Sequence, residues 1–148
     1  MLLMYIYRMK TFKLLFLTLS YSSIFCQSKD EVSIRIVLDQ QTKAWNLGQI
    51  EAFMDGYLRS DSLMFIGKSG ITYGWNKTLD KYKKGYPDTA AMGKLDFSIL
   101  QVRHLCQNHF FVVGRWHLAR TIGDLSGVFT LVFKKIKNSW LIIADHSS

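Results

Sequence analysis

The sequence LDFSILQV, residues 95–102, alternates between two sets of side chains, and a period of two residues is typical of a β-strand. We expect opposite faces of this strand to carry the two sets: Leu95, Phe97, Ile99 and Gln101 against Asp96, Ser98, Leu100 and Val102. Three more strands are expected at residues 110–120, 128–136 and 140–146, with turn residues between them. The C-terminal half is therefore predicted to be a meander of four long strands.

Before Gly93 the apolar residues recur at helical spacing instead. This spacing predicts helices over residues 30–47, 50–57 and 75–86, with a hairpin at residues 63–74 between the second and the third. The order of elements predicts an α+β fold in which three N-terminal helices pack on one strongly curved antiparallel sheet of about six strands. Several strands are apolar on both faces, so we expect a homodimer in which a second copy covers the sheet.

The length of 148 residues and a hydrophobic share of 49% are those of one packed domain. Residues 1–27 combine Arg8, Lys10 and Lys13 with an apolar run over residues 14–25, the pattern of an export signal. The run is shorter than the roughly 20 apolar residues of a membrane-spanning helix. We therefore expect a signal peptide at 1–27, a single domain at 28–148 and no permanent membrane span.

Two further features concern this leader. Met9 begins a more compact signal than Met1 and is an alternative start of the chain. Cleavage after Cys26 would give a periplasmic or secreted protein, and lipid attachment to Cys26 is the alternative.

The charge pattern does not indicate binding to a nucleic acid. The formal net charge is +8, and without the three basic residues of the leader it falls to about +5. The lysine runs at 83–84 and 134–137 are not interleaved with aromatic residues, so we expect them on solvated surfaces.

The four histidines have no metal-ligand spacing, and no glycine-rich phosphate loop occurs. Neither a metal nor a cofactor is expected.

Residues 30–148 carry several stretches that are similar to one known superfamily. They are AWNLGQI at 44–50, GRWHL at 114–118, GVFTL at 127–131 and WLIIADHSS at 140–148. The chain resembles the nuclear-transport-factor-2-like superfamily of cystatin-like cone folds, which includes ketosteroid isomerases and SnoaL-like polyketide cyclases. It looks most like an exported bacterial branch of unknown function. The resemblance implies a cone whose open end is a ligand cavity.

One departure from the isomerases bears on mechanism. The resemblance places their catalytic tyrosine near Gln41 and their basic aspartate near Ile66. An amide is not a weak acid and an isoleucine cannot abstract a proton, so the isomerase mechanism is not expected.

Candidate ligand-binding residues are those that offer a ring or a polar group near the mouth of the cone. They are Gln41, Trp45, Tyr57, Tyr73, Trp75, Tyr82, Trp116 and Arg120. For each aromatic residue a purely structural role in the core is the alternative. Arg120 could hold a carboxylate or a phosphate, or pair with a neighbouring acid.

His146 and Asp61 are the candidate catalytic residues. Asp145 could raise the pKa of His146, but adjacent strand residues point to opposite faces, so both enter one cavity only if the strand ends before them. We expect an exported domain that binds a small, partly apolar molecule. The alternatives are a SnoaL-like, isomerase-like or lyase-type enzyme and a protein-interaction module with a filled cone.

Overall fold

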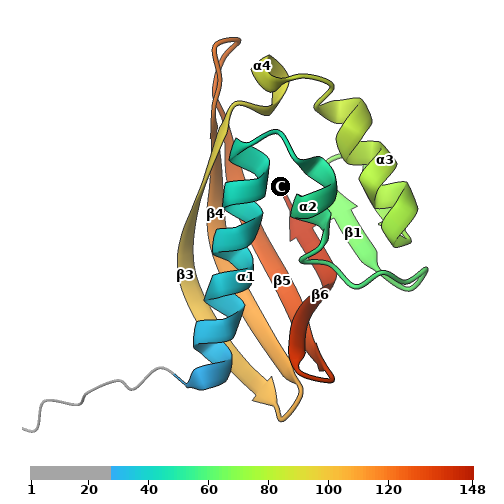
Figure 1. Ribbon diagram of the computed structural model, residues 1–148, viewed down its shortest axis with the longest axis vertical. Coiled ribbons are helices and arrows are strands. Elements are labelled where there is room, and N and C mark those ends of the chain that lie inside the picture. Colours follow the sequence, from blue (N-terminus) through green and yellow to red (C-terminus); the bar gives the residue numbers. More distant parts are fainter. Residues whose placement is uncertain (1–27) are drawn as a thin grey trace, which may run out of the picture.

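The computed structural model describes residues 28–148, in which helices lie on one side of a curved six-stranded sheet (Figure 1). The elements in chain order are α1 (Lys29–Asn46), α2 (Ile50–Met54), β1 (Met64–Gly67), β2 (Gly70–Tyr73), α3 (Trp75–Gly85), α4 (Thr89–Met92), β3 (Lys94–Cys106), β4 (His109–Ala119), β5 (Leu125–Ile136) and β6 (Ser139–Ser147). The predicted α+β class and curved sheet are confirmed. The expected signal peptide lies outside the described residues.

Helix α1 begins and ends where its sequence supplies capping groups. The Ser28 hydroxyl accepts a 3.1 Å hydrogen bond from the main-chain N–H of Glu31. Ile34, Leu38 and Gln41 face the sheet and are buried, as helical spacing requires. After the C-cap, Gly48 has a φ of 76°, which a glycine adopts without steric cost. The chain therefore turns back directly into α2.

The fourth helix was not expected from the sequence. Asp88 caps it by accepting a 2.7 Å hydrogen bond from the N–H of Ala91. A helix of four residues is too short to show a helical period in the sequence. Helix α4 lies beside the β4–β5 hairpin at the top of Figure 1.

The strand order across the sheet is β2-β1-β6-β5-β4-β3. All neighbours are antiparallel except β1 and β6, which are parallel. The expectation of a wholly antiparallel sheet was wrong at this pair, because the hairpin embedded among the helices returns to the edge of the C-terminal strand. Phe65 of β1 thereby lies beside Asp145 of β6.

Bulges interrupt three places in the sheet and contribute to its curvature. Two lie on the β3–β4 ladder, after Ile99 and after His104, and one lies between β5 and β6. Because of the first bulge, the faces expected for the side chains of β3 are wrong after Ile99. Gln101 is exposed, and half-buried Val102 packs against the core in its place.

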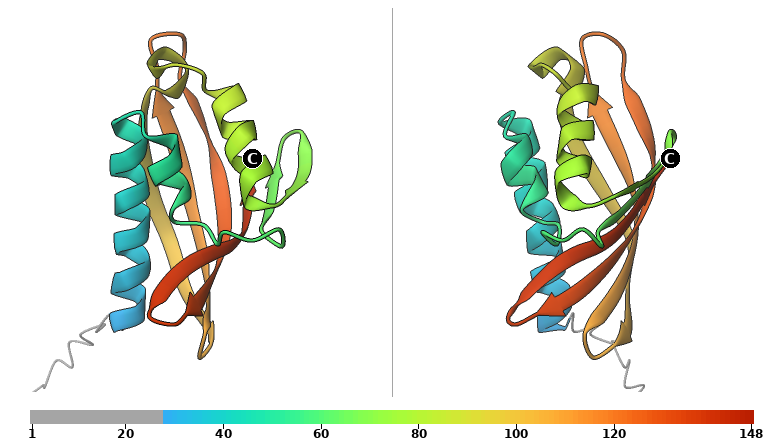
Figure 2. Two further views of the ribbon diagram at one scale, coloured as in Figure 1. Left: turned by 45° about the vertical axis from the view of Figure 1, so that its right-hand side comes forward. Right: turned by 90° about the vertical axis from the view of Figure 1, so that its right-hand side faces the viewer.

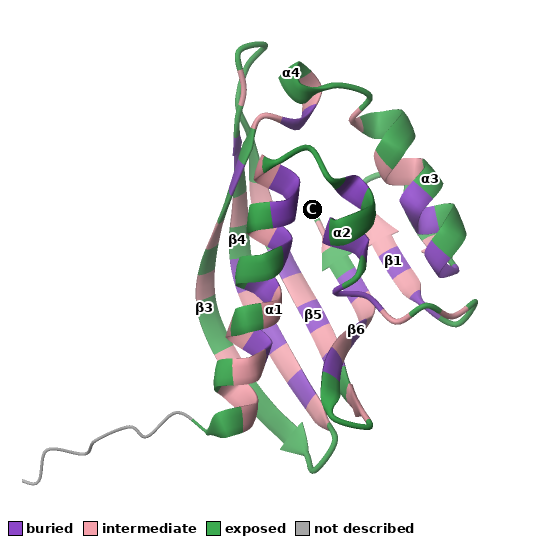
Figure 3. Ribbon diagram, in the orientation of Figure 1, coloured by how far each residue is buried: buried purple, intermediate pink, exposed green. Residues whose placement is uncertain are grey.

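The helices cover only the concave face of the sheet, as the edge-on view in Figure 2 shows. The sides of the helices that face the sheet are buried and their outer sides are exposed (Figure 3). The core therefore lies between the two layers, with Phe133 fully buried near its centre.

Candidate functional site

A pocket of about 500 Å³ lies between the concave face of the sheet and helices α1, α2 and α3. Its aromatic lining residues are Trp45, Phe53, Tyr57, Phe65, Tyr82, Tyr86, Phe97, Trp116 and Phe129. Several rings pack edge to face, with centroids 4.8 Å apart for Trp45 and Tyr86. The rings brace one another, so most of the wall is apolar and held in shape.

Asp145 of β6 is the only acidic side chain that the described residues contribute to this wall. It pairs in register with Phe65 of β1 and Leu131 of β5, and both of these buried side chains also line the pocket. The carboxylate is 4% exposed. The sheet therefore presents a single carboxyl group to a largely apolar wall.

Two hydroxyl groups hold the Asp145 carboxylate. Tyr57 donates a 2.7 Å hydrogen bond to Oδ2, and Ser147 donates a 2.8 Å hydrogen bond to Oδ1. Tyr57 is positioned for this contact because its segment runs beside β6: the N–H of Leu58 donates to the carbonyl of Ile142. Both carboxylate oxygens thus have a partner, as a buried polar group requires.

Burial raises the pKa of Asp145 from 3.8 to about 6, because an apolar surrounding disfavours the charged form. The hydrogen bonds from Tyr57 and Ser147 act in the opposite direction and lower that pKa. Burial also raises the pKa of Tyr57 and of Tyr82 well above 10, and the Asp145 charge adds to both effects. The two tyrosines therefore stay neutral near pH 7, whereas both the protonated and the ionised form of Asp145 can be populated.

The helical side of the pocket is fixed by hydrogen bonds to main-chain carbonyls. Gln41 Nε2 donates to the carbonyl of Phe53 at 3.1 Å, and Trp45 Nε1 donates to the carbonyl of Met92 at 3.1 Å. Gly56 leaves room for the amide, since a Cβ there would lie 2.8 Å from Gln41 Cδ. Gln41 both faces the pocket and ties α1 to α2.

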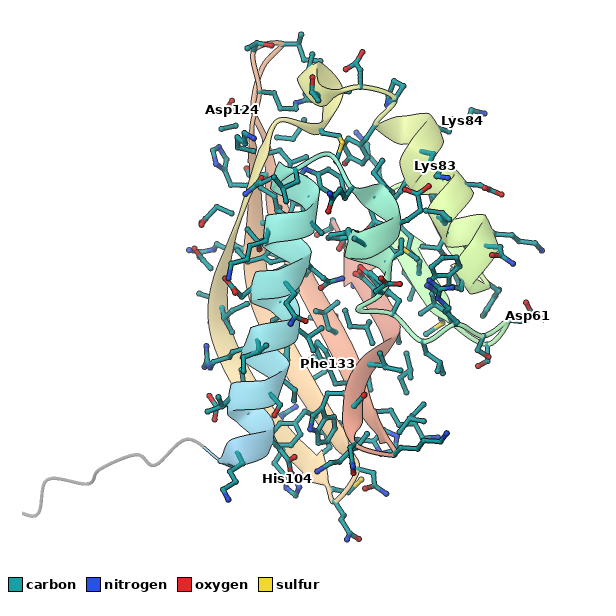
Figure 4. The ribbon with its side chains drawn as sticks, viewed as in Figure 1. Asp61, Lys83, Lys84, His104, Asp124 and Phe133 are labelled. Atoms are coloured by element: carbon teal, nitrogen blue, oxygen red, sulfur yellow. The ribbon has the colours of Figure 1, made fainter. Side chains whose placement is uncertain are left out.

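Arg120 follows β4 and lines the pocket near the β4–β5 turn. Its Nε donates a 2.7 Å hydrogen bond to the carbonyl of Gly123, and its Nη1 donates to the carbonyl of Ala91 at 3.4 Å. Asp124 at the top of Figure 4 accepts a 3.0 Å hydrogen bond from the main-chain N–H of Arg120. The side chain is therefore held by main-chain carbonyls of the turn and of α4.

Six of the eight ligand-binding candidates from the sequence lie on this wall. They are Gln41, Trp45, Tyr57, Tyr82, Trp116 and Arg120. The other two do not. Tyr73 is 55% exposed on β2, and buried Trp75 donates from Nε1 to the carbonyl of Met54 at 2.9 Å.

The two catalytic candidates from the sequence also lie elsewhere, which corrects their expected placement. His146 is exposed and pairs in register with Thr130 and Ile66 on the opposite face of the sheet. Asp61 is exposed in the loop before β1, at the edge of the molecule in Figure 4. Ile66 is likewise absent from the wall, where β1 contributes its neighbour Phe65.

Asp145 and Ser147 were missed because a bulge reverses the alternation within β6. Trp140 and Ile142 point into the core, so strict alternation would turn His146 inward. The register with β5 shifts by one residue between Ile142 and Ala144, which brings Asp145 to the concave face. One rule could have pointed to Asp145: adjacent strand residues point to opposite faces, so only one of Asp145 and His146 can face the pocket.

Residues 28–148 contain no group of three or more His, Cys, Asp or Glu side chains that could hold a metal ion. No helix within this part of the chain is both long and apolar enough to cross a membrane.

Comparison with known proteins places this geometry in a family. The chain is similar to a nuclear-transport-factor-2-like protein of unknown function from Shewanella oneidensis, whose solved structure superposes with a TM-score of 0.77. The sequences are 41% identical, and the match covers 80% of this chain and 98% of that protein. No protein-family model matches the chain, and no curated protein does.

More distant solved structures share the fold. A domain of unknown function with a cystatin-like fold from Nostoc punctiforme has a TM-score of 0.68 at 18% identity, covering 83% of this chain and 78% of that one. A ketosteroid isomerase-like protein from Erwinia carotovora atroseptica has a TM-score of 0.64 at 15% identity, covering 82% and 97%. With the Shewanella protein matched over nearly its whole length, the chain belongs to the nuclear-transport-factor-2-like family.

Proposed function

We propose that this protein binds a small, largely apolar molecule in the pocket on the concave face of its sheet. The observation that carries the proposal is the pocket itself: about 500 Å³, within the usual range of roughly 300–1,000 Å³ for small-molecule sites, with a mainly aromatic wall. A few polar groups converge on this wall, among them Asp145, Tyr57 and Gln41. Such groups orient a ligand whose binding energy comes from apolar contact.

A thermal-shift screen with a blocked pocket tests this proposal. Leu118 is 2% exposed and lines the pocket, so Leu118→Trp should fill space that a ligand needs. Leu47→Trp is the matched control, because Leu47 is 72% exposed after α1 and does not line the pocket. A ligand at about 100 times its Kd adds about 2.7 kcal/mol and should raise the Tm by several degrees.

We expect that rise in the native protein and in Leu47→Trp, and its loss in Leu118→Trp, with both variants checked for native circular dichroism. A screen of apolar and carboxylated compounds that raises no Tm contradicts the proposal. So does an equal rise in both tryptophan variants.

A second candidate is acid–base catalysis in the same pocket, favoured by the raised pKa of Asp145. A carboxyl group with a pKa of about 6 can accept or donate a proton near neutral pH, and Tyr57 supplies an adjacent hydrogen-bond donor. The test is exchange of solvent deuterium into the acidic C–H groups of a carbonyl compound that binds. Exchange that depends on Asp145 would support catalysis. Binding with no exchange above that of Asp145→Asn would leave only the binding role.

The third possibility, an interaction module with a filled cone, has no such support, because the space beneath Trp116 and Tyr57 is open.

We also propose that the protein is a homodimer through the uncovered face of the sheet. Apolar side chains on this face include Leu100, Phe111, Val113, Val128 and Val132. No helix of the described residues covers them (Figure 2). Val128 is 50% exposed near the middle of the sheet, so Val128→Lys should shift sedimentation from dimer to monomer. A native protein that sediments as a monomer at all concentrations contradicts this.

Export is proposed from the leader sequence alone. Residues 1–27 combine basic residues with a short apolar run. Mass spectrometry of the protein purified from its native host should find an N-terminus near Gln27, and a mature chain that begins at Met1 or Met9 contradicts export by cleavage.

A further inference from the structure

The pocket wall carries more positively charged than negatively charged side chains. Lys68 from the β1–β2 turn, Lys81 from α3 and Arg120 line the pocket, and of the lining residues within 28–148 only Asp145 is acidic. Asp145 is already engaged by the hydroxyls of Tyr57 and Ser147 and makes no ion pair with any of the three cations. An apolar pocket with a cationic rim matches a molecule that has an apolar body and a negative group.

Arg120 is the most firmly positioned of these cations. Its Nε and Nη1 donate to the carbonyls of Gly123 and Ala91, and its Cγ packs closely against Gly93, where a Cβ would lie 2.4 Å away. These contacts hold the guanidinium without neutralising it. Within residues 28–148 no carboxylate forms an ion pair with it, and Nη2 donates to no protein group.

Two of the other four arginines of residues 28–148 form ion pairs, and the two that do not, Arg103 and Arg115, are exposed. Arg35 pairs with Glu31 at 2.8 Å in a partly buried position, and Arg59 pairs with Asp55 at 2.8 Å on the surface. Asp124, the acid closest to Arg120 in sequence, instead contacts the main-chain N–H of Arg120 and the ring of His117. The guanidinium of Arg120 is therefore half-buried at an apolar pocket and forms no ion pair within residues 28–148. The hydrogen bond from the main-chain N–H of Arg120 is the main cause of the lowered pKa of Asp124, and the guanidinium charge lowers that pKa further only from a distance.

We infer that the occupant of the pocket is an amphipathic organic anion, whose carboxylate or phosphate group binds Arg120 and whose apolar body lies along the aromatic wall. This rests on the proposed function and names its ligand class. Arginine suits both groups because its fixed N–H donors match their oxygens and its charge persists at all relevant pH values. Lys81 adds positive potential, with its Nζ held 3.2 Å from Thr72 Oγ1 above the ring of Phe65.

The test compares three probes of one chain length by calorimetry near neutral pH, below their aggregation concentrations: decanoate, decyl phosphate and 1-decanol. At least one anion should bind about tenfold or more tightly than the alcohol, the range of a charge-assisted hydrogen bond. In Arg120→Gln this preference should disappear while 1-decanol keeps its affinity. Arg59→Gln is the matched control, because Arg59 is exposed, lies outside the sheet and does not line the pocket.

The outcomes separate the ligand class from the proposed function. Equal binding of all three probes to the native protein overturns the inference and leaves the binding role intact. An anion preference that survives in Arg120→Gln, or is equally lost in Arg59→Gln, also overturns it. Binding of none of the probes overturns the inference as well, whereas the proposed function is judged by the broader ligand screen.

A measurement on the native protein covers the case in which Arg120→Gln does not fold. The preference of the anions over 1-decanol should fall as potassium chloride is added, because salt screens the guanidinium, while the affinity for 1-decanol should not fall. A preference that is independent of salt overturns the inference.

Discussion

The hydroxyl of Tyr57 donates a 2.7 Å hydrogen bond to Oδ2 of Asp145, joining the segment after α2 to the last strand across 88 residues of sequence. Both side chains are at most 4% exposed and both line the pocket. The protonation of Asp145 is therefore coupled to the packing of the segment after α2 against the sheet. It makes the stability of the fold depend on pH in a way that variants can isolate.

Asp145→Asn should remove one component of this pH dependence. The pKa of Asp145 rises from 3.8 in the unfolded chain to about 6 in the folded protein, so the folded state binds the proton more tightly between these values. The contribution to stability is fully present below pH 3.8 and is lost as the pH rises through about 6. The loss is roughly 2–3 kcal/mol, since one pKa unit corresponds to about 1.4 kcal/mol.

Urea unfolding at pH 4 and pH 7.5 measures this component. The native protein should lose more stability than Asp145→Asn between the two pH values, because asparagine does not titrate yet can accept from Tyr57. Asp61→Asn, at an exposed position, is the control and should follow the native protein. Identical pH profiles for the native protein and Asp145→Asn would show that this carboxyl does not carry the effect.

Tyr57→Phe should move the same transition to higher pH. Burial is the main cause of the raised pKa of Asp145, and the hydrogen bond from Tyr57 partly offsets it. Without the hydroxyl the ionised carboxylate loses a donor, so the pKa of Asp145 should rise further. The variant should lose about 1–3 kcal/mol at pH 7.5 and less at pH 4, where the carboxyl is protonated. A loss that is equal at the two pH values contradicts this account.

Gly114→Ala should destabilise the protein by about 1–3 kcal/mol. Gly114 is buried on β4, and a Cβ there would lie 2.3 Å from Cζ of Phe129, whose ring lines the pocket. The ring must shift or the strands must separate. Gly85→Ala is the matched control: it is the last residue of α3 with nothing within 4 Å of the added Cβ, so it should be neutral or slightly stabilising. Urea unfolding measures the stability of both variants. An equal loss of stability in the two would contradict the close contact between position 114 and Phe129.

The sequence predicted the sheet and most of the wall because both depend on local period. Trp116 and Leu118 face inward as their alternation on β4 requires. Bulges are not encoded in that period: they exposed Gln101 on β3, and on β6 they exchanged the facing of His146 and Asp145. The partnership of Tyr57 with Asp145 depends on the parallel contact between residues 57 and 142, which only the assembled sheet creates.

Trp116→Phe should cost less stability than Trp45→Phe, although both tryptophans line the pocket. The Nε1 of Trp45 donates to the carbonyl of Met92, whereas the buried Nε1 of Trp116 has no hydrogen-bond partner among the described residues. Replacing Trp45 leaves a carbonyl without its donor, while replacing Trp116 removes an N–H group whose burial is uncompensated. Trp45 is also 3% exposed and Trp116 only half-buried, so Trp45→Phe loses more packing. We expect a difference of about 1–3 kcal/mol in the free energy of unfolding measured with urea. If Trp116→Phe costs as much as Trp45→Phe, the indole N–H of Trp116 makes a stabilising contact that this geometry does not contain.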